Sequence, residues 1–318
     1  MKPPVARRTM FFPLKNRLYF NPKETPQTFH EFLIHLLGFY LGKDWYKHQR
    51  AGSVGRRHPL AKWYASLCDL QRRNMTEGNR VGDVWTVEPT GDALCLLAAA
   101  YDLYCLVDAG VDVQPMVQRL RKLSYFQGAR YELAVGAILA RCGWKVEPLT
   151  DLSSKHADFL ATAGLTAIEV EAKSRHRRGV LAEGGKFDPA KSLRGDVDKL
   201  LSEGMGQTTG ANPAVIFIDV NALQGTDLLA VQWFEDIRKI LAGRPTPEPA
   251  CPDRFSLIVA TNYSWHYSGK ASPQSASYLV VRSLFPRHEL ATELIATLDA
   301  SLASYGKVPP NQPVRVID

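Results

Sequence analysis

Residues 167–173 of the chain read Ala167-Ile168-Glu169-Val170-Glu171-Ala172-Lys173. Apolar and charged residues alternate here, as they do in a β-strand whose two faces meet different surroundings. Alternate side chains of a strand share a face, so the apolar residues at even positions point to one side of the predicted sheet. Glu169, Glu171 and Lys173 point to the other side. Two acids and a lysine in a row suit either an exposed strand face or an active site.

A partner strand is expected just upstream, at residues 156–161, joined to the first by the turn Thr162-Ala163-Gly164. Asp158 lies in this strand, and the turn can bring it beside Glu171 in a register that the sequence leaves open. Two carboxylates this close repel each other, and each resists ionisation without a nearby cation. A divalent metal resolves the conflict, and oxygen ligands favour magnesium or manganese. Lys173 is then placed to orient or deprotonate a water that attacks phosphorus.

The order of the surrounding elements predicts an α/β fold with a mixed sheet and helices on both faces. The run at residues 214–220 is rich in β-branched residues, which is typical of a strand buried on both faces. The remaining elements are expected as helices at residues 127–141, 192–203, 227–241 and 289–305 and as strands at residues 144–148, 255–260 and 278–282.

The first part of the chain, residues 1–124, is predicted to be an all-helical N-terminal region. Thr25-Pro26-Gln27-Thr28 is a helix start, with a capping residue and a proline, and Gly42 can end that helix. A basic, glycine-containing loop is expected at residues 48–58. Further helical patterns cover residues 60–73, 90–106 and 113–123. The chain therefore divides into this region and a second part, residues 125–318.

Asp158, followed after twelve residues by Glu171-Ala172-Lys173, resembles the PD-(D/E)xK, or restriction-endonuclease-like, superfamily of nucleases. The helix that carries Glu132 upstream strengthens the resemblance, which covers about residues 125–265. Ala157 stands where the motif's name has a proline. No closer subfamily is identified.

The resemblance implies that Asp158, Glu171 and the main-chain carbonyl of Ala172 hold Mg²⁺ or Mn²⁺. It also implies that Lys173 handles the nucleophilic water and that Glu132 is a supporting catalytic acid. A restriction-endonuclease-like core and a role in bacterial defence or mobile-element biology would follow from it.

Two glycines give independent support for a role of Glu132. Gly128 and Gly136 lie four residues before and after it, on the same helical stripe. A glycine costs a helix about 1 kcal/mol relative to alanine. Their placement predicts that something packs closely against this stripe.

The loop after the motif is basic. Residues 173–194 hold seven lysines and arginines against two acids. Such a run is usually a solvated surface, but beside paired carboxylates it can hold a phosphate backbone. The residues predicted to bind nucleic acid are Arg175, Arg177, Arg178 and Arg194.

Three further polar residues are expected to have mainly structural roles. Glu169 is predicted to pair with a basic neighbour, with a second metal contact as the alternative. His156 is interpreted as a surface or hydrogen-bonded histidine. Gln207 is interpreted as a polar residue at a helix C-terminus, with substrate contact as the alternative.

Composition limits the function classes. The net charge of +7 and the pI near 9.1 suit a polyanionic partner. Five separated cysteines without a CxxC pair indicate neither a zinc finger nor a disulfide framework, and no Walker lysine pattern suggests ATP use. The most apolar stretch, residues 94–107, contains Asp102 and is too short to cross a bilayer. We therefore expect a cytoplasmic protein with no membrane partner.

The sequence thus predicts a metal-dependent nuclease that hydrolyses phosphodiester bonds, with DNA favoured over RNA. The helical N-terminal region would present substrate, form a homodimer or bind a protein partner. The alternative is a catalytically inactive nucleic-acid-binding or scaffold module with the same fold. A third interpretation is an interaction subunit in which the nuclease core is vestigial.

Overall fold

The structure is a computed structural model that describes residues 18–20, 28–51, 57–77, 79–81, 84–149, 156–224 and 231–311. The chain forms two compact units. The first comprises Met1–Tyr104, Trp265–Gln274 and Gly306–Asp318, and the second comprises Cys105–Ser264 and Ser275–Tyr305. Residue 124, where the sequence predicted the change between two parts, lies inside the second unit.

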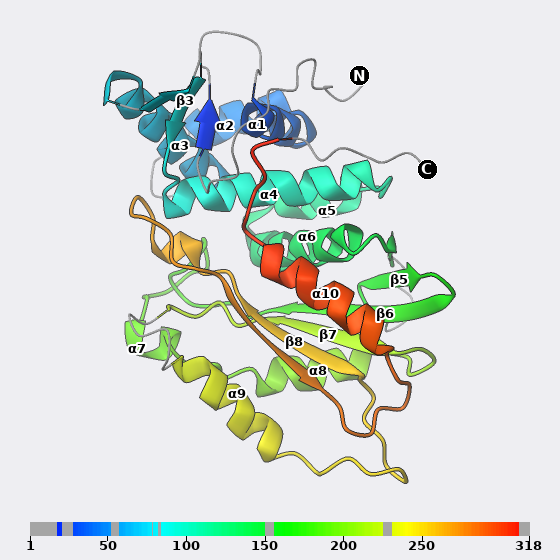
Figure 1. The fold of residues 1–318 in the computed structure, drawn as a ribbon. Coiled ribbons are helices and arrows are strands. Elements are labelled where there is room, and N and C mark those ends of the chain that lie inside the picture. Colours follow the sequence, from blue (N-terminus) through cyan, green and yellow to red (C-terminus); the bar gives the residue numbers. More distant parts are fainter. Residues whose placement is uncertain are drawn as a thin grey trace. The chain divides into compact units, whose positions relative to one another are not determined.

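The second unit is built on a six-stranded mixed sheet with the order β4-β5-β6-β7-β8-β9 (Figure 1). The three central strands β6, β7 and β8 are parallel to one another, and every other neighbouring pair is antiparallel. This confirms the mixed sheet predicted from the sequence. The strands are β4 (Lys145–Pro148), β5 (Phe159–Ala163), β6 (Thr166–Ser174), β7 (Ala214–Asp219), β8 (Leu257–Asn262) and β9 (Ser277–Arg282).

Helices cover both faces of this sheet, as the predicted α/β fold requires. In Figure 1, α6 and α10 lie on one face, and α8 and α9 lie on the other. α6 packs on β4 and β6, whereas α8 packs on β6 and β7. The helices of the unit are α5 (Gln114–Leu120), the short 3-10 turn η2 (Leu123–Tyr125), α6 (Phe126–Arg141), α7 (Pro189–Ser192), α8 (Asp198–Gln207), α9 (Gln232–Ala242) and α10 (Thr292–Ser304).

The core of the sheet lies at β7 and β8, whose residues are all buried. On the face covered by α8 and α9, Ile216 and Ile218 of β7 pack with Trp233 and Ile237 of α9. The β-branched run at residues 214–220 is therefore buried on both faces, as predicted.

The expected helix at residues 192–203 is instead two helices, α7 and α8, separated by a break around Gly195. The Gly195 N–H donates to Oδ2 of Asp236 at 3.0 Å. A β-carbon at this glycine would lie 3.0 Å from the Trp233 carbonyl oxygen. The main chain therefore runs directly against α9 here, and this tertiary contact replaces a continuous helix.

The first unit contains helices and a small antiparallel sheet of order β1-β3-β2. The prediction that the N-terminal region is all-helical was therefore wrong. Its strands hold three or four residues each, too few to show a hydrophobic period. The elements are β1 (Leu18–Phe20), α1 (Phe29–Leu41), α2 (Lys43–Ala51), α3 (Pro59–Glu77), β2 (Asn79–Val81), β3 (Val84–Val87), α4 (Gly91–Asp108), whose last turn belongs to the second unit, and the 3-10 turn η3 (Trp265–Tyr267).

Helix α1 begins later than the Thr25 cap suggested. Its N-cap is Thr28, which forms a reciprocal capping box with Glu31. Residues 25–27 lie outside the described part of the chain. Gly42 ends the helix with φ 84°, as predicted. The loop expected at residues 48–58 is helical as far as Ala51, and residues 52–56 are not described.

No helix in the described segments is both long and apolar enough to cross a membrane.

A buried ion pair joins α6 to the sheet in the second unit. Arg130 Nη2 lies 2.9 Å from Oδ2 of Asp219, and the two side chains are 9 % and 1 % exposed. Burial raises the pKa of Asp219, and the Arg130 charge opposes this rise. The pair therefore holds α6 above the end of β7 at the cost of desolvating two charges.

We predict that Arg130→Ala lowers the free energy of unfolding by about 3–5 kcal/mol, because it leaves Asp219 buried without its partner. Urea denaturation measures the change. The control is Arg238→Ala, which removes an exposed pair with Glu235 and should cost less than about 1 kcal/mol. A loss no larger than the control's would show that the buried pair does not hold α6.

Candidate active site

The register of the β5–β6 hairpin brings two carboxylates together. Phe159 pairs with Val170, so continuing the register by one residue places Asp158 opposite Glu171. Asp158 lies immediately before β5, not within a strand as the sequence suggested. Its N–H donates to Oε2 of Glu171 at 3.1 Å, and its Oδ2 accepts from the Ala172 N–H at 2.8 Å. Each acid is therefore held by the other strand's main chain.

The main-chain carbonyl of Ala172 points toward the same edge as these acids. In a strand the N–H and C=O of one residue lie on the same side. The Ala172 N–H is directed at Asp158, where β5 has not yet begun. The carbonyl oxygen therefore points to the same side of β6 as Asp158.

Lys173 is held at the same place by two partners. Its Nζ lies 2.6 Å from Oε1 of Glu171 and donates to Oε1 of Gln207 at 2.5 Å. Gln207 is the last residue of α8, so the amide at this helix end fixes the lysine. The Lys173 side chain remains 20 % exposed, so it is not fully enclosed by these partners.

Helix α8 covers this acidic face of β6 because Gly204 has no side chain. A β-carbon at Gly204 would lie 2.9 Å from Cγ2 of Ile216 and 3.6 Å from Cγ of Glu171. The close approach leaves Glu171 only 1 % exposed. The charged face of β6, for which the sequence allowed either solvent exposure or an active site, is therefore buried. Its charges need partners within the protein.

Glu132 lies on α6 and is paired with Arg119 of α5. Arg119 Nη1 donates to Oε1 of Glu132 at 2.9 Å, and Nη2 contacts Oε2. The Arg119 side chain is 43 % exposed and that of Glu132 is 12 % exposed. Glu132 is close enough to Asp158 and Lys173 for both to act on its pKa. Glu132 therefore contacts Arg119 directly and interacts with the motif residues through their charges.

Only one of the two glycines beside Glu132 marks a close contact. A β-carbon at Gly136 would lie 3.2 Å from Cδ2 of Leu106 and 3.3 Å from Cε1 of Phe159. At Gly128 the nearest atom is Oε1 of Glu132, at 4.0 Å. The predicted close packing is thus confirmed at Gly136 and wrong at Gly128.

Burial disfavours ionisation of all three acids, and the Asp158 carboxylate further disfavours it at Glu171 and Glu132. Burial, then the nearby Asp158 carboxylate, raises the pKa of Glu171 to about 8 and that of Glu132 to about 7. Burial also raises the pKa of Asp158, while the Ala172 N–H and the Lys173 charge lower it. Perturbed carboxylates that cluster in this way are common at functional sites.

This donor set suits a hard divalent cation. Two carboxylates and a carbonyl offer oxygen donors, and a cation would offset the burial and the repulsion that raise the pKa of Glu171. Among the described residues, no three His, Cys, Asp or Glu side chains gather into a metal-binding group. Metal binding by Asp158, Glu171 and the Ala172 carbonyl stays a prediction.

The structure corrects the role expected for Arg177. This side chain is buried, and its guanidinium donates to main-chain carbonyls rather than facing solvent. It contacts the carbonyl oxygens of Lys191, Arg194, Val220 and Asn221. Arg177 therefore anchors the loop after β6 and is not available to a nucleic acid.

The other predicted nucleic-acid contacts differ in exposure. Arg178 and the Arg194 side chain are exposed. Arg175 is 20 % exposed and pairs with Asp196 at 3.0 Å. Two of the four arginines are thus presented to solvent.

Glu169 and His156 are both hydrogen-bonded within the protein. Glu169 does not pair with a basic residue as predicted: its carboxylate accepts from the N–H and hydroxyl of Thr209 and from Asn212 Nδ2. His156 is hydrogen-bonded, with Nδ1 2.7 Å from the Ala157 carbonyl oxygen. Glu169 therefore has its partners in the segment after α8, whereas the His156 charge lowers the pKa of Asp158.

Two site contacts had no clear sequence pattern. Arg119 precedes Glu132 by 13 residues across η2, and Gln207 follows Lys173 by 34 residues. Neither spacing is a helical or strand period, so only the fold brings these side chains together.

Comparison with known proteins identifies no relative. No protein-family model matches the chain, and neither a curated protein nor a solved structure matches it significantly. The argument for function therefore depends on the site's own geometry.

We predict that Arg119→Ala raises the pKa of Glu132 further above about 7, because both the charge and the hydrogen bonds of Arg119 lower it. Carboxyl-carbon NMR titration with selectively labelled glutamate measures the shift. Arg238→Ala is the control and should leave the Glu132 resonance unchanged. An unaltered or lower midpoint in Arg119→Ala would contradict the pairing.

We also predict that the metal-free protein becomes less stable as pH rises from about 4.5 to about 8. The pKa of Glu171 is raised on folding, so the unfolded state releases its proton first and gains stability across this window. The loss should be on the order of a few kcal/mol. Urea denaturation in EDTA at a series of pH values measures it, and Glu171→Gln should flatten the slope. An equal slope in the variant would exclude Glu171 as the source.

Proposed function

We propose that this chain is a metal-dependent nuclease with a restriction-endonuclease-like core of the PD-(D/E)xK type, acting on phosphodiester bonds in DNA. One observation supports it most: Asp158 and Glu171 are interlocked across the β5–β6 hairpin, with Lys173 against Glu171. Buried acids in this arrangement lower the free energy of unfolding unless a bound cation offsets their charge. Chance pairing on a solvated strand face does not explain their burial.

The residues that would hold Mg²⁺ or Mn²⁺ are Asp158, Glu171 and the Ala172 carbonyl. When bound, the ion would activate a water and neutralise negative charge that develops on the phosphate. Asp158 and Glu171 need no large rearrangement for this role, because main-chain N–H groups already orient one oxygen of each carboxylate.

Lys173 would position the attacking water. Its ammonium is fixed between Glu171 and Gln207 before any substrate arrives, so little ordering is required during the reaction. A water bound to Nζ would accept a hydrogen bond there and direct a lone pair at phosphorus. Gln207 acts through Lys173 and is a positioning residue.

Glu132 and Arg119 would shape the charge at the site entrance. Glu132 is a supporting acid whose raised pKa lets it exchange a proton near neutral pH. The half-exposed Arg119 would balance the charge of Glu132 when that acid is ionised. Arg178 and Arg194 are the exposed arginines that would hold the phosphate backbone farther along.

We predict that the purified chain cleaves DNA only with Mg²⁺ or Mn²⁺, and that Asp158→Asn and Lys173→Met each lower the rate at least about 100-fold. Asp158→Asn removes a ligand charge and Lys173→Met removes the ammonium at nearly constant volume. Linear, circular and single-stranded DNA and a matched RNA are compared by gel electrophoresis. Mn²⁺ binding measured by electron paramagnetic resonance should weaken in Asp158→Asn but persist in Lys173→Met.

Arg238→Ala is the folded control and should cleave like the wild type. Equal cleavage by all variants would contradict the assigned site. Cleavage of RNA alone would contradict the DNA substrate. Salt-dependent DNA binding without cleavage or Mn²⁺ binding would favour the catalytically inactive binding module instead.

A further inference from the structure

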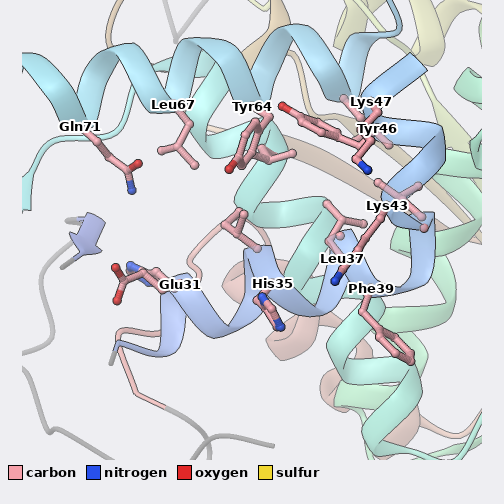
Figure 2. A pocket seen from close by; sticks show the side chains of 17 residues that line it. Glu31, His35, Leu37, Phe39, Lys43, Tyr46, Lys47, Tyr64, Leu67 and Gln71 are labelled. Carbon is pink, nitrogen blue, oxygen red and sulfur yellow. The ribbon is translucent and has the colours of Figure 1, made fainter. Parts of the chain in front are cut away.

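The first unit contains a pocket of about 820 Å³ between α1 and α3 (Figure 2). On α3 its lining follows one helical stripe, Leu60, Tyr64, Leu67 and Gln71. On α1 a second stripe, which includes Ile34 and Leu41, completes the walls. Ligand pockets are typically about 300–1,000 Å³ and mainly apolar with a few polar groups, and this pocket has both properties.

Gly38 lines the pocket without a side chain that could fill it. It is an exposed residue of the α1 stripe, four residues after Ile34. A β-carbon at Gly38 would meet no heavy atom within 4 Å. Its φ angle is an ordinary helical one, so no backbone conformation demands glycine here. The missing side chain therefore leaves space that a larger residue would fill.

The two ends of the pocket differ in charge. Figure 2 shows Lys43, Tyr46 and Lys47 at one end and Glu31 and Gln71 at the other. Within the described chain neither lysine lies in a salt bridge. Glu31 is engaged by Thr28 in the α1 capping box, and its charge disfavours an anion at that end. An acidic group is thus favoured beside the two lysines.

The dimensions suit a small elongated ligand. The stripe from Leu60 to Gln71 spans eleven residues, or roughly 16 Å of helix. A slender apolar body can lie along this length.

We propose that this pocket binds an amphipathic organic anion, with its apolar body between α1 and α3 and one carboxylate or phosphate group at Lys43 and Lys47. The apolar walls provide the burial, and the lysines select the charged end. This binding is independent of the acid cluster in the second unit and of nuclease activity.

Isothermal titration calorimetry tests the proposal with the full chain and four probes: decanoate, decyl phosphate, uncharged 1-decanol and inorganic phosphate, all below micellar concentration. At least one of the two decyl anions should bind with one-to-one stoichiometry. 1-Decanol should bind at least about tenfold more weakly, because it forgoes two charge-assisted contacts. Inorganic phosphate should show no saturable binding.

Variants locate the site. Gly38→Leu should weaken anion binding at least about tenfold by filling the pocket, whereas Gly38→Ala should remain near wild type and shows that a side chain is tolerated in α1. The double variant Lys43→Ala/Lys47→Ala should lose about tenfold for the anion and none for 1-decanol. Lys307→Ala, an exposed lysine outside the pocket, is the charge control.

Unchanged binding in a folded Gly38→Leu protein would overturn the proposal, as would an affinity for 1-decanol equal to that for the decyl anion that binds. Stoichiometry well above one, or no binding of either anion by the wild type, would also overturn it. None of these results depends on cleavage, so failure here is separate from failure of the nuclease proposal.

Discussion

The antiparallel pairing of β5 with β6 is the constraint on which the candidate active site depends. Phe159 and Val170 are paired and fully buried on the face that α6 covers. A slip of one residue would move this apolar set to the opposite face, so the hydrophobic side of the hairpin fixes the register strongly. The positions of Asp158 and Glu171 follow from that register. Apolar packing on one face therefore sets the carboxylate geometry on the other.

The acid cluster works against the stability of the unit that holds it. Ile216 and Ile218 of β7 lie on the same face as Glu171 and Lys173 of β6 and belong to the apolar core under α8 and α9. Apolar residues at the β6 positions would extend that core, and replacing buried charges in this way is often stabilising. Local conflict between stability and residue choice is expected chiefly at functional sites. The burial of Glu171 in place of an apolar residue is thus an argument for a functional role. This argument is independent of the resemblance to a nuclease motif.

Short-range patterns predicted much of the second unit. The helical period found α6 to within a residue at its start, the β-branched run found β7, and one tight turn was enough to place Asp158 near Glu171. Contacts between distant segments left no such pattern. Arg177 resembles its neighbours in the basic loop, yet it donates to four carbonyls from two other stretches of the chain, residues 191–194 and 220–221. The break at Gly195 depends on the contact of this segment with α9. The strands of three residues in the first unit are too short to show a hydrophobic period.

Gly38 and Gly204 show why pockets and close helix contacts cannot be predicted from the sequence. Both are glycines within helices at positions where the backbone does not require glycine. At Gly204 the absent side chain lets α8 close over Glu171, and a β-carbon would strike Ile216. At Gly38 the absent side chain faces empty space and leaves a pocket open between α1 and α3. A leucine would therefore have opposite consequences at the two positions. At position 204 it would push α8 away from Glu171, whereas at position 38 it would fill the pocket without moving a helix.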